Sequence, residues 1–217
     1  MYPRESELVI QMLKKFSCIQ GCSDCCMYRE YYPSLEYGKI GVLILPEEKP
    51  KVEEMAVKTD ITVKIIPRLG FGKSKKGNKG PKKIVAYQMM GKNMDGDLCP
   101  FLDIESSQRS PHGGFGCKIY EERPLACRAY PVIDENSASS VRLDHNCTFC
   151  HKHSTTTTDK NGLQREIESL SKIKAGVCVD EKTAVWSYAT AIGDDVNRAQ
   201  LLPEGWILQN KTPGKQR

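Results

Sequence analysis

Hydrophobic residues repeat at helical spacing near both ends of the chain. Five apolar side chains between positions 8 and 16 recur every three or four residues, which predicts an amphipathic helix over residues 5–16. The same spacing in residues 163–173 predicts a second helix, with Gly176 as its expected end. A third helix is expected to begin near Asp180 and to carry Val185, Tyr188 and Ile192.

Apolar runs in the first half of the chain predict strands at residues 40–46, 61–67 and 83–90. After the first strand, Pro46 followed by two glutamates suits the first turn of a helix that runs to about Lys58. The glycine- and lysine-rich segment before residue 83 is expected to be a solvated hairpin loop.

The second half of the chain is punctuated by prolines and polar residues. Residues 117–132 suit a β-ribbon or a short helix broken at Pro124. The pattern as a whole predicts an α+β fold: a small, irregular, metal-stabilised cysteine-cluster domain over residues 1–158. A helical C-terminal extension with a disordered tail would follow over residues 159–217.

The positive charge of the chain is concentrated in one segment. The formal net charge is +5, and six lysines lie between Lys73 and Lys83, so the rest of the chain carries about −1. Phosphates of nucleic acid could meet these lysines, but only Phe71 offers an aromatic ring, so a solvated loop is the favoured interpretation. A Gly-Lys-Ser sequence in this segment does not make a nucleotide-binding loop, because Pro67 stands where that motif needs glycine.

The N-terminal sequence and the lengths of the apolar runs bear on the compartment. The first 16 residues mix charged and apolar side chains, unlike a signal peptide, and no apolar run is long enough to span a bilayer. We therefore expect a cytoplasmic protein whose thiols stay reduced.

The chain has ten cysteines, and four of them occur in "CIQGCSDCC" at residues 18–26. Disulfides, a redox-active thiol pair and a metal site are the competing explanations. Cys18, Cys22 and Cys25 are spaced to face one ion, whereas Cys26 would point elsewhere, to a second metal, another iron of one cluster, or the core. Two Cys-x2-Cys pairs (22/25 and 147/150) would complete one zinc site but leave Cys18, Cys26, Cys99, Cys117 and Cys127 unexplained.

The order of these motifs resembles the YkgJ-like CxxCxxCC family of zinc- or iron-chelating domains. "CIQGCSDCC", "CPFLD", "CKIYEERPLACRAYP" and a later cysteine occur in the family's order over residues 10–150, with three residues rather than two between Cys18 and Cys22. The resemblance implies eight metal ligands: Cys18, Cys22, Cys25, Cys26, Cys99, Cys117, Cys127 and Cys147. It also implies an iron–sulfur cluster, of the 4Fe–4S type, or zinc, in redox chemistry or metal handling.

Two other functions stay open at this point. Relatives include proteins labelled iron–sulfur oxidoreductases and flagellin lysine methylases, so a cluster-dependent lysine N-methylase-like enzyme is one alternative. A structural zinc module that meets RNA or another protein through the lysine-rich segment is the other. The redox or protein partner is not identified by the sequence.

Several further residues are candidates of lower rank. His145, His151 and His153 crowd around Cys147 and Cys150 and could give a mixed Cys/His site. Cys178 lies outside the resemblance and is expected to be a buried free cysteine. Three arginines could balance the charge of bound thiolates: Arg123, Arg128 and Arg142.

Overall fold

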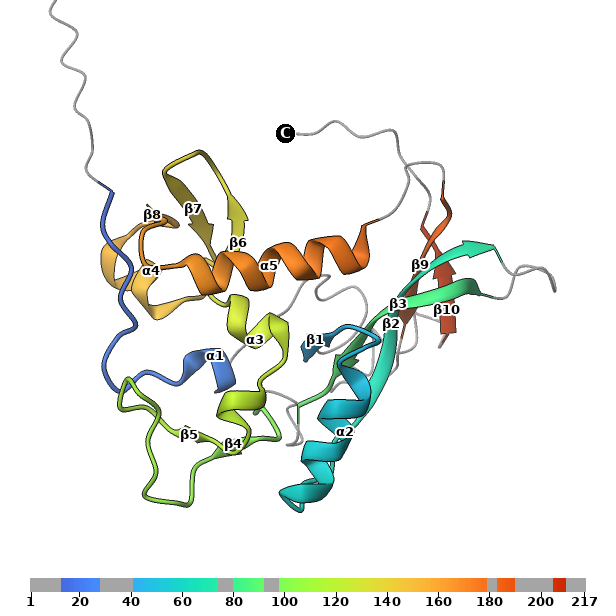
Figure 1. Ribbon diagram of the computed structural model, residues 1–217, viewed down its shortest axis with the longest axis horizontal. Coiled ribbons are helices and arrows are strands. Elements are labelled where there is room, and N and C mark those ends of the chain that lie inside the picture. The colour runs from blue at the N-terminus through green and yellow to red at the C-terminus, as the bar shows by residue number, and fades with distance from the viewer. Residues whose placement is uncertain are drawn as a thin grey trace, which may run out of the picture.

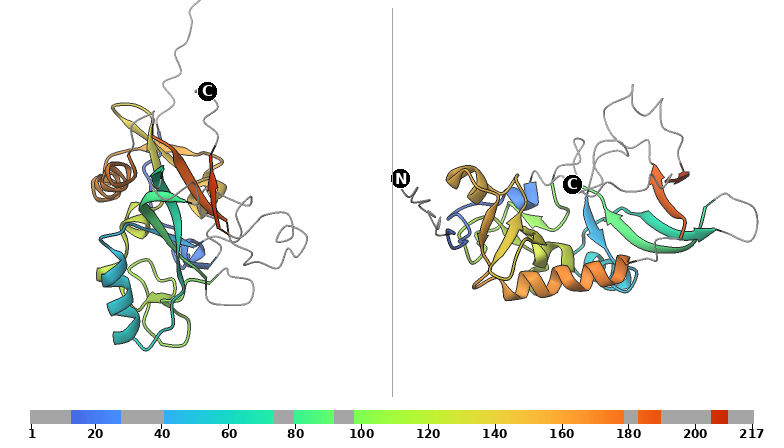
Figure 2. Two further views of the ribbon diagram at one scale, coloured as in Figure 1. Left: turned by 90° about the vertical axis from the view of Figure 1, so that its right-hand side faces the viewer. Right: turned by 90° about the horizontal axis from the view of Figure 1, so that it is seen from above.

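The computed structural model describes residues 13–27, 41–73, 80–91, 98–178, 183–189 and 205–209. Helices and antiparallel strands are mixed along the chain, which confirms the predicted α+β class. Two sheets lie at opposite ends of the molecule, and the longest helix runs between them (Figures 1 and 2). The short helix that carries Cys127 lies beside this longest helix (Figure 1).

A five-stranded antiparallel sheet forms one end of the molecule, in the order β1-β3-β2-β9-β10. Its strands are β1 (Val42–Ile44), β2 (Ile65–Lys73), β3 (Pro81–Met89), β9 (Val185–Ala189) and β10 (Gly205–Leu208). The helix α2 (Lys49–Lys58) buries Val52, Met55 and Ala56 against the apolar side chains of β1 and β3. This packing satisfies the apolar face of α2 and gives the first of two hydrophobic cores.

A three-stranded sheet forms the other end, in the order β6-β7-β8. It comprises β6 (Val132–Glu135), β7 (Ser140–Leu143) and β8 (Thr157–Asp159), with α4 (Thr148–His153) between the last two strands. The helix α5 (Gln164–Val177) buries Leu170 in the second hydrophobic core, together with Val141 and Leu143 of β7.

Short elements connect the two cores. They are α1 (Asp24–Met27), β4 (Leu102–Asp103), β5 (Gly116–Cys117), the 3-10 helix η2 (Tyr120–Glu122) and α3 (Leu125–Ala129). Pro124 separates η2 from α3, so the predicted short helix broken at this proline is confirmed. Irregular backbone of this kind predominates where the cysteines gather, as the sequence predicted.

The N-terminal helix prediction is wrong where it can be compared. Residues 13–16 are not helical, and Lys15 instead forms a parallel bridge with Asp159 at the edge of the three-stranded sheet. The helical spacing of apolar residues is satisfied differently, because Phe16 packs against Phe149 with ring centroids 5.0 Å apart. The remainder of this prediction, residues 5–12, lies outside the described residues.

The predicted third helix is wrong over its described part, because Val185 to Ala189 form a strand. This strand pairs with β2 through the partners Leu69 and Ser187, and its Trp186 side chain is buried. The Trp186 indole Nε1 donates a hydrogen bond to the carbonyl oxygen of Gly72 at 2.8 Å. Pairing with an available sheet edge therefore overrode the weak helical spacing.

The observed bounds of the elements differ from the predicted bounds in three further places. The strands β2 and β3 extend to Lys73 and back from Pro81, farther into the glycine- and lysine-rich segment than predicted. The helix α2 begins at Lys49, with Pro50 in its first turn, whereas Pro46 precedes it. Gly176 does not end α5 but lies within it, where a Cβ atom would stand only 3.0 Å from Leu45 Cδ1.

The division of the chain at residue 158 stays a prediction, and the predicted tail lies outside the described residues. No helix within the described ranges is long and apolar enough to cross a membrane.

Candidate metal centre

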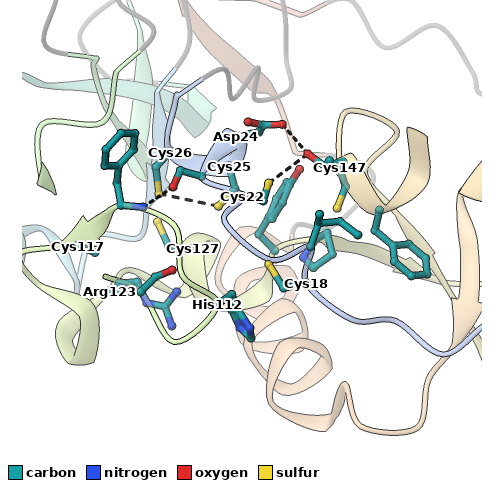
Figure 3. A pocket seen from close by; sticks show the side chains of 18 of the residues that line it. Cys18, Cys22, Asp24, Cys25, Cys26, His112, Cys117, Arg123, Cys127 and Cys147 are labelled. Carbon is teal, nitrogen blue, oxygen red and sulfur yellow. Dashed lines mark hydrogen bonds between the residues drawn. The ribbon is translucent and has the colours of Figure 1, made fainter. Parts of the chain in front are cut away.

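Seven of the ten cysteines line a single cavity of about 180 Å³ between the two hydrophobic cores. They come from the loop and helix at residues 18–26, from β5, from α3 and from the residue before α4 (Figure 3). The seven are Cys18, Cys22, Cys25, Cys26, Cys117, Cys127 and Cys147. The structure thus brings together seven of the eight cysteines that the resemblance implied.

The eighth cysteine, Cys99, lies behind this wall. Its backbone N–H donates to the carbonyl oxygen of Cys26 at 2.8 Å, and its side chain packs with Cys117 and Cys127 against the first core. Cys99 therefore supports the cavity from the side of the first core and is not among the residues that line it.

Cys26 does not point away from its neighbours, as the helical spacing had predicted. The sulfur atoms of Cys25 and Cys26 are 3.9 Å apart, and both side chains line the cavity. Both cysteines lie on α1, which has only four residues and is therefore little more than a single helical turn. A thiol pair on so short a helix can serve one polynuclear centre from adjacent positions.

A polar loop at residues 110–116 holds the first cysteine segment in place. The Gly21 N–H, in a left-handed backbone conformation at φ 78°, donates to the His112 carbonyl at 2.7 Å, and the Phe115 N–H donates to Ser23 Oγ at 2.7 Å. Gly114 approaches so closely that a Cβ atom there would lie 2.2 Å from the Cys22 carbonyl oxygen. Only glycine permits this contact.

Glu48 fixes the position of α3 and therefore of Cys127. One carboxylate oxygen accepts a hydrogen bond from the Leu125 N–H at 2.7 Å, at the start of α3, and the other accepts from the Leu45 N–H at 2.9 Å. A helix start has unpaired N–H groups, and a carboxylate is the preferred partner for them. The first core is thereby tied to the wall of the cavity.

A chain of hydrogen bonds joins the first cysteine segment to α4 on the opposite wall (Figure 3). The Thr148 hydroxyl donates its one proton to Asp24 Oδ2 at 2.5 Å, and Thr148 Oγ1 lies 3.2 Å from Cys22 Sγ. The Cys22 thiol is consequently the donor to Thr148 in this arrangement. Cys147, next to Thr148, is thus held opposite Cys22.

Burial and crowding favour the neutral form of these thiols. Burial, followed by the neighbouring sulfurs of Cys22, Cys25 and Cys147, raises the pKa of Cys18 to about 11. The hydrogen bond with Cys25, burial and nearby thiols raise the pKa of Cys26 strongly. Metal binding must therefore displace protons from this cavity, and a cation there would relieve the repulsion among thiolates.

Burial also raises the pKa of Cys117 and of Cys147. The Arg123 guanidinium opposes this shift at Cys117, because a nearby positive charge favours the thiolate. Arg123 and Arg128 both line the cavity, whereas Arg142 pairs with Asp134 at 3.5 Å on the three-stranded sheet. The structure thus separates Arg142 from the other two arginines.

The other candidate residues lie outside the cavity. Cys150, His145 and His151 border a separate, open surface pocket of about 350 Å³, and burial raises the pKa of Cys150 to about 12. His153 Nδ1 lies 3.1 Å from Lys14 Nζ and its ring packs on Phe149. Cys178 follows the end of α5 and is exposed, so the prediction that it is buried is wrong.

Two residues of the cavity were missed by sequence reasoning. His112 and Asp24 both line it, although neither follows a recognisable ligand spacing (Figure 3). Asp24 is separated by one residue from Cys22 and could have been considered for that reason. His112 is isolated in the sequence, so only the fold of the 110–116 loop reveals its position.

The donor chemistry of the cavity suits a thiophilic metal, since thiolates are preferred ligands of zinc and of iron–sulfur clusters. Within the described ranges, however, no three His, Cys, Asp or Glu side chains form a group that could hold a single metal ion. The seven thiols surround a volume and do not converge on one point.

Comparison with protein families agrees with this donor set. Residues 17–151 match the family model CxxCxxCC, described as "Putative zinc- or iron-chelating domain". Neither the curated proteins nor the solved structures compared with the chain give a match. The matched segment covers more than half of the chain and contains every cysteine that lines the cavity. The chain therefore belongs to the CxxCxxCC family of zinc- or iron-chelating domains.

Proposed function

We propose that the cavity holds an iron–sulfur cluster, of the 4Fe–4S type, and that the protein acts in redox chemistry or metal handling. The observation that carries this proposal is that seven thiols surround one cavity of about 180 Å³. A structural zinc site is closed, with four ligands on a single ion. A cavity that has room for more than a single ion favours a polynuclear cofactor.

The number of thiols leaves room for more than one metal site. Four cysteines hold either one zinc ion or one 4Fe–4S cluster, so the seven thiols on the cavity exceed the need of any single four-cysteine site. The surplus is sufficient for part of a second site, with Cys99 directly behind the wall. Zinc beside the cluster is therefore compatible with this donor set.

The chain's own residues would hold and shield such a cluster. The Thr148–Cys22 contact and the Cys99–Cys26 backbone hydrogen bond orient two of the ligand segments. Phe16, Ile19 and Phe149 supply apolar surface on one side of the cavity, which limits access of water to it. When bound, the cluster would supply one-electron chemistry at a potential set by these surroundings.

The test is elemental analysis of protein purified without oxygen. We expect iron and acid-labile sulfide in equal amounts, close to four of each per chain for one 4Fe–4S cluster, with broad visible absorbance. Stoichiometric zinc in a colourless protein that lacks iron and sulfide would contradict the proposal and favour a structural zinc module.

A further inference from the structure

Two arginines and a histidine border the thiol cavity on the side that solvent can reach. Arg123 is half-buried, whereas Arg128 and His112 are exposed, and all three line the cavity. In the view of Figure 3, Arg123 and His112 lie below Cys22, Cys25 and Cys26, on the side where Cys18 and Cys127 also lie. We call these three residues the arginine rim.

Arg123 is held in a defined orientation by Tyr120. Its Nε donates to the Tyr120 carbonyl oxygen at 2.9 Å, and its guanidinium carbon lies 3.9 Å from the centroid of the Tyr120 ring. Both contacts leave the two terminal amino groups of Arg123 without a hydrogen-bond or ion-pair partner among the described residues. The guanidinium fork is therefore oriented in advance for a ligand.

Arg128 lies next to Arg123 and is oriented by backbone as well. Its Nε donates to the Arg123 carbonyl oxygen at 2.6 Å, and one terminal amino group is 3.4 Å from the Glu121 carbonyl oxygen. Neither arginine forms an ion pair with a carboxylate in the part of the chain that the structure describes. This holds even though Asp24 and Glu166 line the same cavity.

Two arginines at one cavity that are oriented by backbone carbonyl oxygens and form no ion pair among the described residues need an explanation. One explanation is that they balance the negative charge of metal-bound thiolates. A thiolate, however, is a single acceptor, whereas the guanidinium fork matches two oxygens of a carboxylate or a phosphate. The exposure of Arg128 and His112 also directs the rim towards solvent.

We propose that the arginine rim binds the carboxylate or phosphate group of a small anionic molecule at the mouth of the thiol cavity. Bound there, the anion would lie beside the cluster, so the rim would define the charge class of the substrate or of an external ligand. The position beside a cluster rests on the proposed function, but the anion site itself rests on the arginines alone.

The test uses the full chain, purified without oxygen and carrying the metal it contains. Binding of inorganic phosphate and of succinate is measured by calorimetry at low ionic strength, and the tighter of the two identifies the preferred group. We expect Arg123→Gln to weaken binding about tenfold or more, because charge-assisted hydrogen bonds are lost. Arg123→Lys keeps the positive charge but loses the two-pronged guanidinium, so its anion affinity is expected to lie between those of the wild type and Arg123→Gln.

Arg142→Gln is the matched control, because it removes the same charge from a site that pairs with Asp134 outside the cavity. Unchanged binding in this control and unchanged metal content in the Arg123 variants would support the proposal. Loss of metal from Arg123→Gln would overturn it and show that the arginine balances thiolate charge. Equal weakening in the control, or no binding of either anion by the wild type, would also overturn it.

Should Arg123→Gln fail to fold, the same question is answered on the wild type. Added phosphate or succinate is expected to change the visible or near-ultraviolet circular dichroism of the metal–thiolate chromophore, and an unchanged spectrum would contradict the proposal. Iron and sulfide content, measured on the same samples, reports separately on the proposed cluster.

Discussion

Cys25 acts on thiols from several parts of the cavity. Its sulfur lies 3.9 Å from that of Cys26, and its charge acts on the pKa of Cys18, Cys117 and Cys147. These residues come from the N-terminal loop, from β5 and from the segment before α4. A single thiol that is close to three separate segments makes the cavity one connected site.

Cysteine substitutions should separate ligands from bystanders. We expect Cys117→Ser to lower the metal content per chain, because Cys117 lines the cavity. Structural metal contributes on the order of 10 kcal/mol to folding, so the variant should also be more sensitive to protease. The measurement is metal per chain together with limited proteolysis.

Cys178→Ser is the matched control for this substitution. Cys178 is exposed after the end of α5, and surface changes of this kind usually alter stability by no more than about 0.5 kcal/mol. Loss of metal in Cys178→Ser with retention in Cys117→Ser would show that the ligand assignment is wrong.

The raised thiol pKa values predict that the stability of the metal-free protein depends on pH in the alkaline range and that the stability of the metal-loaded protein does not. Burial raises the pKa of Cys18 from 9.0 to about 11, so the folded state favours the neutral thiol more than the unfolded state does. The stability that this thiol contributes is complete below pH 9 and is lost as the pH rises to about 11. A metal-bound thiolate has no proton to lose in that window.

We therefore expect the urea midpoint of the metal-free protein to decrease as the pH is raised from about 9 to about 11. The urea midpoint of the metal-loaded protein is expected to stay constant over this range. Urea unfolding at several pH values under reducing, oxygen-free conditions measures both curves. Metal affinity should move the other way and rise with pH, by up to about tenfold per unit for each proton displaced. A metal-free curve that is flat over this range would contradict the assigned burial of Cys18.

At the scale of elements, the cavity is built from pieces too short to be stable alone. The helices α1, η2 and α3 have four, three and five residues, and β5 has two. Isolated helices of this length do not form in water, so neighbouring structure must hold each one. Glu48 does this for α3 through its hydrogen bond to the Leu125 N–H.

Glu48→Ala tests this support directly. The change removes the acceptor of two backbone N–H groups, Leu45 and Leu125, and should lower the free energy of unfolding by roughly 1–3 kcal/mol. Because α3 carries Cys127, metal affinity should also fall. Chemical denaturation and competition with a chelator measure the two effects.

Glu47→Ala provides the control, since the neighbouring Glu47 is exposed. It is expected to leave both the unfolding free energy and the metal affinity close to those of the wild type. Equal effects of the two substitutions would mean that the local charge matters and the Glu48 hydrogen bonds do not.

At the scale of the whole molecule, the cavity lies where two hydrophobic cores meet. Cys117 and Cys127 pack against the core of α2 and the five-stranded sheet, whereas Cys147 belongs to the core of α5 and the three-stranded sheet. A cofactor bound by both groups would cross-link the two halves and close very long chain loops. Metal binding should therefore couple the halves of the molecule.

Hydrogen exchange before and after chelation tests this coupling. The nine-residue strands β2 and β3 pair over most of their length, so their amides should keep much of their protection without metal. Amides of the short segments at residues 18–26 and 110–129 should lose protection first, because few ladder hydrogen bonds hold them. Simultaneous loss of protection in β2 and β3 would show one cooperative unit that depends wholly on metal.

The sequence by itself determined the family, the α+β class and seven of the eight predicted cysteines that line the cavity. Cysteine spacing carries this information because the order and spacing of cysteines can be read directly from the sequence, without knowledge of the backbone between them. The periodic segment at residues 163–173 was read correctly as a helix, although α5 continues past Gly176, and Pro124 breaks the short helix in front of Cys127. These features depend on local side-chain chemistry.

Only the tertiary structure decided which surfaces those segments meet. The spacing of Val185 and Tyr188 fits a helix, yet this segment forms β9, because β2 offers an edge for pairing. Cys26 turns into the cavity beside Cys25, and His112 and Arg123 reach its mouth, through contacts between segments far apart in the chain. Such contacts depend on long-range packing and hydrogen bonding, which leave no periodic trace in the sequence.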